Sequence, residues 1–380
     1  MVIGSEGLKM AMDWVEKLEE AVEECKRNLR VQGVTFSKEL KSFVENPENH
    51  LKKKLFIYTH DLARGKMELA EYIRKSAAAL RTSFRTNLRT AYQSWVLLEI
   101  LSLMGEFGGR IVYPEYNFIP IDRAGKQRSG IIPPNVIMYI SGRGYISFFV
   151  EAPRPVGWED TSDLSRSWRL YTALRPDFMV YGGMVTNILD ESKDPPIARP
   201  DVIIECKELE DWYLRTRDIR GPFTKPLTAE EWRSKWIEGL WTGLADALGV
   251  KSPSEAKSFV EEKKTLRVRE PKLLKLYMNF YNPKEMYLVS RARVPGDVRD
   301  YLERDGIIVV DNVGFGGKRL RKLAESLLKH CKRGSSIKIE FSGDEARILE
   351  ELTRVFSSRL GRSVSVREAV ILAAKEVLEE

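Results

Sequence analysis

A carboxylate and an ammonium group follow an apolar run in residues 199–207, which read Arg-Pro-Asp-Val-Ile-Ile-Glu-Cys-Lys. The run predicts a buried β-strand, and side chains two residues apart on a strand point to the same face. Glu205 and Lys207 therefore share one face at the end of this strand. Because buried strands seldom carry charge, the pair indicates either a structural ion pair or a metal-bound carboxylate beside a lysine that activates water.

A second acid precedes another apolar strand, in Arg175-Pro176-Asp177. The same tripeptide recurs upstream of Glu205 and ends at Asp201. Four residues along one strand separate Asp201 from Glu205 by about 13 Å, whereas a neighbouring strand would bring Asp177 within about 5 Å of lateral spacing. Two ligands of one magnesium ion each lie about 2 Å from it. We therefore expect Asp177, and not Asp201, to share a metal with Glu205.

Cysteines and histidines are too few and too scattered for several other chemistries. The chain has three of each: Cys25, Cys206, Cys331, His50, His60 and His330. This pattern predicts no disulfide framework, and it disfavours a zinc enzyme or a Ser-His-Asp hydrolase. Carboxylates and lysines remain, and these suit Mg²⁺ or Mn²⁺. We expect no organic cofactor.

Composition is typical of a folded globular protein. The chain has 380 residues, of which 43% are hydrophobic and 31% charged, and its formal net charge is +7. This length allows two or three domains. A modest positive charge permits binding to nucleic acid without proving it. The sequence contains no apolar run long enough for a membrane span and no signal-peptide pattern, so we expect a cytoplasmic protein.

The order of elements predicts an α/β (or α+β) core between two smaller parts. Residues 1–85 have helical periodicity and many basic residues, typical of a solvated face, a phosphate-contacting arm or a dimerisation helix. A helix over 86–106 carries Glu99. Strands are then predicted at 110–118, 135–140, 145–150, 175–181, 199–208, 285–292 and 307–311, and helices at 164–174, 228–248, 296–304 and 318–330. Residues 251–272 are expected to be helical in part.

The Pro-Asp strand followed by the Glu-x-Lys strand resembles the PD-(D/E)xK nuclease superfamily, which includes restriction endonucleases and Holliday-junction resolvases. The resemblance covers roughly residues 86–331 and implies a restriction-endonuclease-like mixed β-sheet flanked by helices. It implies that Asp177 and Glu205 bind Mg²⁺, with the main-chain carbonyl of Cys206 as a third ligand. Lys207 would orient or deprotonate the attacking water. Glu99 matches an extra acid on the preceding helix, and Glu106 competes with it for this role.

The predicted helix at 228–248 begins with the capping box Thr228-Ala229-Glu230-Glu231. Its tryptophans are typical of a core stripe. Arg233 and Lys235 fall on other faces of the helix, and we expect them to reach phosphate.

The C-terminal residues 336–380 resemble a ribbon–helix–helix DNA-binding domain. Residues 336–341 alternate as a strand, and two helices follow, the second of which opens with the capping box Ser365-Val366-Arg367-Glu368. In that family, strands from two chains pair and enter the major groove. The resemblance implies DNA contacts by Ser336, Lys338 and Glu340 and phosphate contacts near Ser363 and Ser365. A plain dimerisation module is the alternative.

Together these patterns predict a Mg²⁺-dependent DNA endonuclease that forms a homodimer through residues 336–380. Two alternatives remain: a DNA-binding or regulatory protein that keeps a nuclease fold without cleavage, and a nuclease that acts on RNA.

Overall fold

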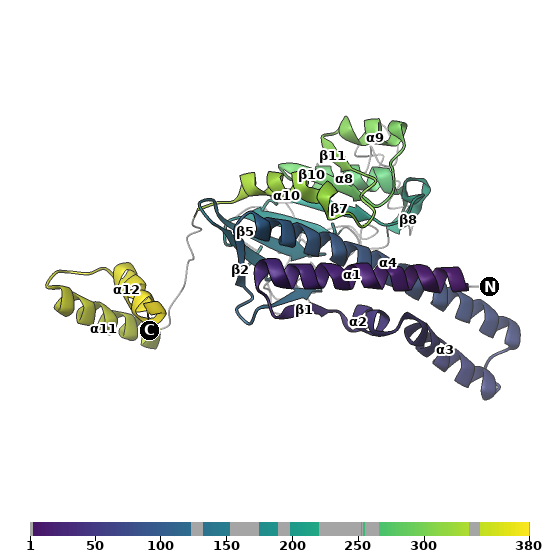
Figure 1. Cartoon of the computed structure of the whole chain (residues 1–380), viewed down its shortest axis with the longest axis horizontal. Helices are drawn as coiled ribbons and strands as arrows, with labels where there is room; N and C mark the ends of the chain where they lie inside the picture. Colours follow the sequence, from purple (N-terminus) through teal and green to yellow (C-terminus); the bar gives the residue numbers. More distant parts are fainter. Residues whose placement is uncertain are drawn as a thin grey trace. The chain divides into compact units, whose positions relative to one another are not determined.

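A computed structural model describes residues 3–122, 132–152, 175–188, 198–219, 252, 254, 266–333 and 343–379. The chain divides into two compact units, Met1–Gly334 and Ser335–Glu380. Figure 1 labels the elements of both units, and each unit is described by itself. No helix in these described ranges is long and apolar enough to cross a membrane.

A seven-stranded mixed sheet forms the centre of the first unit, with strand order β11-β10-β7-β6-β5-β4-β2. Its strands are β2 (Gly109–Tyr113), β4 (Val136–Ile140), β5 (Gly144–Val150), β6 (Phe178–Gly182), β7 (Val202–Lys207), β10 (Glu285–Ser290) and β11 (Ile307–Val310). β7, β10 and β11 are parallel to one another, and the remaining pairs are antiparallel. The predicted α/β class with a mixed sheet is confirmed, as is the predicted hairpin of β4 and β5.

Two apolar cores lie on the two faces of this sheet. The helices α1 (Ser5–Leu29), α4 (Leu69–Glu106) and α10 (Arg321–Leu327) share one core with Val202, Ile204 and Cys206 of β7. The helices α8 (Glu270–Tyr281) and α9 (Gly296–Glu303) share the other core with Ile203. Because side chains alternate along a strand, Glu205 and Lys207 point to the face that α8 covers.

The described part of the first unit also contains two further helices and two small sheets. The helices are α2 (Lys38–Glu45) and α3 (Pro47–Ala63), and both pack near α4 (Figure 1). Each begins at a capping side chain, since Ser37 accepts from the Leu40 N–H and Asn46 from the Asn49 N–H. β1 (Gly33–Phe36) pairs in parallel with β3 (Phe118–Ile121), and β8 (Thr216–Ile219) pairs with the antiparallel strand β9 (Leu266–Arg269).

Several elements differ from the expectation. α4 runs without a break across residue 85, where the sequence placed the end of a separate helical region. Gly33–Phe36 forms a strand inside the region expected to be helical, because its β-branched and aromatic residues pair with β3. The helix expected over 318–330 is divided into the 3₁₀ turn Gly317–Leu320, α10 and the 3₁₀ turn Leu328–His330. In the segment 251–272, expected to be helical in part, the structure has β9 and then the first residues of α8. The helices expected at 164–174 and 228–248 lie outside the described residues.

The described part of the second unit is a pair of helices, α11 (Gly343–Leu360) and α12 (Val366–Glu379), around a small core of Phe356, Val364 and Ala369. α11 ends at Gly361, whose φ of 64° lies in the left-handed region that glycine favours. The Ser365 hydroxyl accepts the Glu368 N–H at 3.2 Å, as the capping box predicted. The strand expected at 336–341 lies outside the described residues.

Candidate active site

Two buried carboxylates face each other where β6 begins and β7 ends. The β6–β7 register pairs Phe178 with Ile204, and one step further it brings Asp177 opposite Glu205. The Asp177 N–H donates to Oε2 of Glu205 at 3.1 Å, and the Cys206 N–H donates to Oδ2 of Asp177 at 2.7 Å. Asp177 and Glu205 are 6% and 2% exposed. Asp201 lies at the other end of β7, where it accepts from the Gly182 N–H and pairs with Lys284 and Lys332.

Lys207 lies between two acids on the face of β7 that α8 covers. Its Nζ is 3.0 Å from Oε1 of Glu205 and 2.7 Å from Oε2 of Glu270, the first residue of α8. The same ammonium group is 6.0 Å from the centre of the Trp212 ring. Lys207 is therefore fixed in direction, with one acid from its own strand and one from α8.

An amide that sequence reasoning did not select reaches Asp177 from α4. The Gln93 Nε2 donates to Oδ1 of Asp177 at 2.5 Å, and both side chains are buried. The sequence signal that could have identified Gln93 is its position as a polar residue within the apolar part of α4. A buried amide requires a hydrogen-bond partner, so such a residue points to a polar group nearby. We infer that Gln93 fixes the orientation of the Asp177 carboxylate.

A cavity of about 260 Å³ opens beside these side chains, and we call it the Asp177 cavity. It is lined by Asp177, Glu205, Lys207, Gln93 and further charged groups: Arg85, Arg89, Arg175, Arg215, Glu151, Glu208 and Glu270. Arg85 and Arg89 come from α4, and neither makes an ion pair within the described part of the chain. The cavity thus brings cations suited to phosphate beside two acids suited to a metal ion.

Burial and mutual repulsion control the charge of the acid pair. Burial first, and then the charge of Glu205, raises the pKa of Asp177 well above its ordinary value, and Lys207 offsets this only in part. Burial also raises the pKa of Glu208. The Cys206 side chain belongs to the core on the opposite face of the sheet, and burial there raises the pKa of its thiol. The thiol therefore remains protonated, which leaves only the main chain of Cys206 available to the site.

The Asp177 and Glu205 carboxylates supply the oxygen ligands that magnesium prefers. Each of their four oxygens, however, already accepts a hydrogen bond from the protein. The four donors are Gln93 Nε2, the Cys206 N–H, the Asp177 N–H and Lys207 Nζ. A carboxylate oxygen has lone-pair capacity for a second partner, and Mg²⁺ commonly takes one or two protein carboxylates together with water. In the described ranges no three His, Cys, Asp or Glu side chains converge on one metal position. Asp177 and Glu205 therefore fit a cation as a pair, and the Cys206 carbonyl stays a predicted third ligand.

Glu99 does not join this cavity, in contrast to the expectation of an extra catalytic acid. Its carboxylate lies against Gly317, where a methyl group in place of the glycine hydrogen would collide with it. Burial raises the pKa of Glu99 to about 7, with smaller contributions from the charges of Glu24 and Glu106. Gln93, nearly two turns earlier on α4, occupies the position beside Asp177. Glu106, the competing acid, pairs with Arg321 at 2.9 Å.

We expect Glu99→Gln to stabilise the protein at alkaline pH without loss of any site function. A glutamate in the unfolded chain has a pKa of about 4.3, whereas that of Glu99 in the folded chain is about 7. The wild type therefore has its full free energy of unfolding below about pH 4.3 and loses part of it as the pH rises to about 7. The variant lacks this loss, and at pH 8 its free energy of unfolding should exceed that of the wild type by up to about 3 kcal/mol. Urea titrations at pH 4 and pH 8 measure the difference. An equal gain at both pH values, or a gain in the exposed control Glu19→Gln, would contradict this origin.

The remaining predicted contacts to nucleic acid lie mostly outside the described residues. Arg233, Lys235, Ser336, Lys338 and Glu340 all belong to this group. Ser363 and Ser365 are exposed in the connection between α11 and α12, and Ser365 already caps α12.

Comparison with known proteins identifies no relative: no family model, no curated protein and no solved structure matches the chain. The functional argument therefore depends on the site itself.

Proposed function

We propose that this chain is a cytoplasmic, metal-dependent DNA endonuclease with a restriction-endonuclease-like core of the PD-(D/E)xK type. One observation carries the proposal: Asp177 and Glu205 lie opposite each other on paired strands, and Lys207 follows on the same face. Well-packed apolar residues often stabilise a buried position as well as an ion pair does, which favours a chemical role for these charges.

The residues at the cavity have distinct roles in phosphodiester hydrolysis. Asp177 and Glu205 would hold Mg²⁺ or Mn²⁺ together with the carbonyl of Cys206, and the bound ion supplies charge stabilisation and a more acidic water. Lys207 donates from Nζ and orients the attacking water or the scissile phosphate. Arg85 and Arg89 bind phosphate at the mouth of the cavity, and Gln93 holds Asp177 in place.

The first test is cleavage of plasmid DNA by the purified full chain with Mg²⁺ or Mn²⁺. We expect nicked and linear products with either ion and none when EDTA is in excess, because the acid pair needs a cation to act on phosphate. RNA of matched sequence is incubated in parallel. Cleavage in EDTA would contradict the metal requirement, and cleavage of RNA alone would reassign the substrate.

Binding of nucleic acid without cleavage is the second candidate function, and one observation favours it. All four carboxylate oxygens of the acid pair accept protein hydrogen bonds, and Lys207 is ion-paired twice. Such a saturated network is also what a structural ion pair would have. DNA binding with no product under any divalent ion would favour this function over the nuclease.

We propose further that residues 336–380 hold two copies of the chain together, in the manner of a ribbon–helix–helix domain. Large apolar side chains are exposed on α11 and α12: Ile348, Val355, Leu360, Val366, Val370, Ile371 and Val377. A unit this short buries few apolar residues by itself, and pairing removes such surface from water. Light scattering should give a dimer for the full chain and a monomer for a chain that ends at residue 333. A monomeric full chain would contradict the proposal.

A further inference from the structure

A second hollow, of about 900 Å³, runs along α4 and adjoins the Asp177 cavity. It lies between α4 on one side and α2 and α3 on the other, and we call it the α4 groove. The α4 groove and the Asp177 cavity share four lining residues: Thr86, Arg89, Gln93 and Glu151. The two hollows therefore adjoin each other at these four side chains, which lie beside the proposed catalytic residues.

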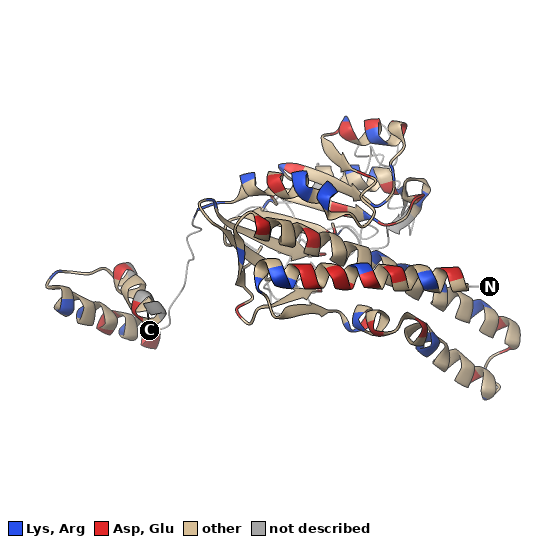
Figure 2. Ribbon diagram, in the orientation of Figure 1, with Lys and Arg blue, Asp and Glu red and all other residues tan. Residues whose placement is uncertain are grey.

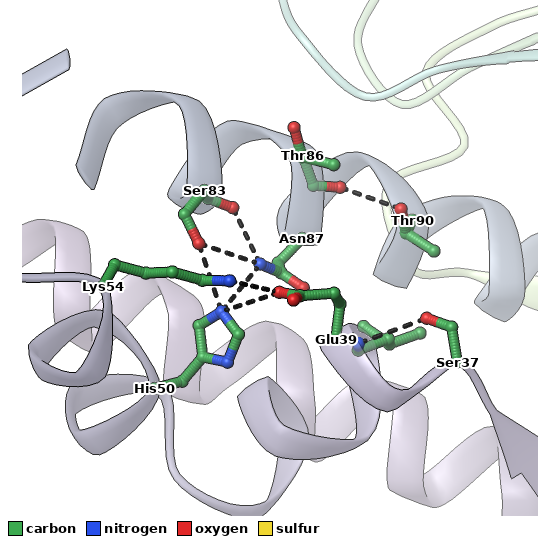
Figure 3. A network of polar contacts seen from close by, with 9 residues as sticks. Ser37, Glu39, His50, Lys54, Ser83, Thr86, Asn87 and Thr90 are labelled. Atoms are coloured by element: carbon green, nitrogen blue, oxygen red, sulfur yellow. Dashed lines mark hydrogen bonds and ion pairs between the residues drawn. The ribbon is translucent and has the colours of Figure 1, made fainter. Parts of the chain in front are cut away.

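Polar contacts between α3 and α4 hold the groove in shape (Figure 3). The buried His50 of α3 meets the Ser83 hydroxyl of α4 at 3.1 Å and the Asn87 amide at 3.3 Å, all through its Nε2. Lys54 pairs with Glu39 at 2.6 Å across α2 and α3. Glu39 also lies 3.6 Å from the same His50 nitrogen. In a hydrolase triad the serine and the acid contact different nitrogens of the histidine ring, whereas Ser83 and Glu39 both contact Nε2 of His50. This network therefore cannot relay a proton in that way, and its role is to join the helices.

The lining of the groove suits a sugar–phosphate chain. Most of the α4 side chains in the lining are small or bear a hydroxyl group: Ala78, Ala79, Thr82, Ser83, Thr86, Thr90 and Ser94. The others from α4 are Lys75, Asn87, Arg89 and Gln93. Small side chains let a ligand approach the helix closely, and hydroxyls donate to phosphate oxygens. Tyr58 of α3 presents an aromatic ring on the opposite wall, and such rings stack on unpaired bases. The acids in the lining are Glu39, which Lys54 pairs, together with Asp122 and Glu151.

A row of four arginines on α4 leads toward the Asp177 cavity, and its last member, Arg89, lines both hollows, whereas Arg74 and Arg81 line neither. Arg74, Arg81, Arg85 and Arg89 are spaced by seven, four and four residues on α4, which places them on one face of the helix. The row extends over about 22 Å at 1.5 Å per residue. None of the four makes an ion pair within the described part of the chain. α1, by contrast, exposes Asp13, Glu16, Glu19, Glu20 and Glu23, which repel phosphate (Figure 2).

We propose that the α4 groove holds a single-stranded DNA segment and leads it into the Asp177 cavity, so that the substrate is DNA with an unpaired tail. This assignment rests on the proposed nuclease function. A volume of about 900 Å³ corresponds to a pocket for one medium-sized ligand, so it accepts a few unpaired nucleotides and excludes a duplex. Lys75 and Arg89, the α4 cations in the lining, contact the phosphates of the strand, and Tyr58 stacks on a base.

A matched pair of alanine-to-tryptophan variants tests the groove. Ala78 lines the groove, whereas Ala70, two turns earlier on the same helix, does not, and both are exposed. Fluorescence anisotropy of the full chain compares a labelled blunt duplex with the same duplex carrying a single-stranded tail, in EDTA so that nothing is cleaved. We expect the wild type and Ala70→Trp to bind the tailed DNA about tenfold more tightly or better, and Ala78→Trp to lose this preference.

The salt dependence gives an independent measurement. Lys75 lines the groove and not the Asp177 cavity, so Lys75→Ala should reduce the slope of log affinity against log salt by about 0.7 for tailed DNA and leave blunt duplex unaffected. Equal binding of blunt and tailed DNA by the wild type, a preference retained in Ala78→Trp, or a stronger preference for an RNA tail would each overturn the proposal. Because these readouts need no cleavage, they separate failure of the groove assignment from failure of the nuclease function.

Discussion

Replacing Asp177 with asparagine should abolish DNA cleavage and at the same time stabilise the protein against unfolding. The side chain keeps its shape, and its carbonyl oxygen still accepts the Cys206 N–H. The variant loses one of the two negative charges that would hold the metal, so cleavage should fall by about 10²-fold or more. The stability gain follows because burial and Glu205 oppose ionisation of Asp177 in the folded chain.

The stability gain should depend on pH in a defined direction. The folded pKa of Asp177 lies well above its ordinary value, so the wild type is fully stable below about pH 4 and loses stability as the pH rises toward the folded value. Asparagine does not titrate. The difference between the two unfolding curves should therefore be near zero at pH 4 and grow toward neutral pH, which denaturant titrations at several pH values measure.

Asp201→Asn is the matched control, because both aspartates end an Arg-Pro-Asp tripeptide. Although burial opposes ionisation of Asp201, hydrogen bonds from Lys284, Gly182 and Lys332 lower the pKa of its carboxyl. Its charge therefore stabilises the fold at neutral pH, and this contribution disappears as the pH falls through the lowered pKa. We expect Asp201→Asn to lose stability and retain cleavage. If both variants cleave normally, Asp177 has no catalytic role; if only Asp201→Asn is inactive, the metal lies at the other end of β7.

The sequence predicted the centre of the fold better than its periphery. An uninterrupted apolar run such as residues 202–204 is a reliable sign of a strand, because a strand buried on both faces needs apolar side chains on each. β6 and β7 were found where they were expected. Gly33–Phe36 was expected to be helical, because its strand depends on pairing with residues more than eighty positions away. The length of α4 was also missed: its basic first half and apolar second half look like two elements, and the packing of α3 and α1 joins them into one helix.

The site was predictable only where residues are close in sequence or belong to adjacent strands. Glu205 and Lys207 share a face by strand alternation alone, and Asp177 follows from strand pairing. Gln93 and Glu270 reach the same point from two helices on opposite faces of the sheet, and no local pattern indicates that. Glu99 was chosen because it is an acid on the correct helix. Its position around the helix turns it instead toward Gly317. The resemblance therefore identified the helix that reaches the site, but not the residue on that helix that does so.

Replacing Lys207 with methionine should have the largest effect on folding stability of any single change at the site. The substitution removes the cation from between Glu205 and Glu270, and it leaves a buried carboxylate with its charge uncompensated. Breaking a buried ion pair in this way costs about 3–5 kcal/mol of unfolding free energy, and cleavage should be lost as well. Lys284→Met is the control, because that lysine is 55% exposed and the buried Asp201 keeps Lys332 as a second partner, so we expect a smaller loss than in Lys207→Met.

The double variant Glu205→Gln with Lys207→Met separates catalysis from structure. Removing both charges leaves no uncompensated carboxylate on β7, so a large part of the stability lost in Lys207→Met should return. Cleavage should remain absent, because the metal ligand and the ammonium group are both missing. Denaturant titrations and plasmid cleavage are measured on the same preparations. Stability that returns together with cleavage would identify the Glu205–Lys207 pair as a structural ion pair, and the nuclease would have to act elsewhere on the chain.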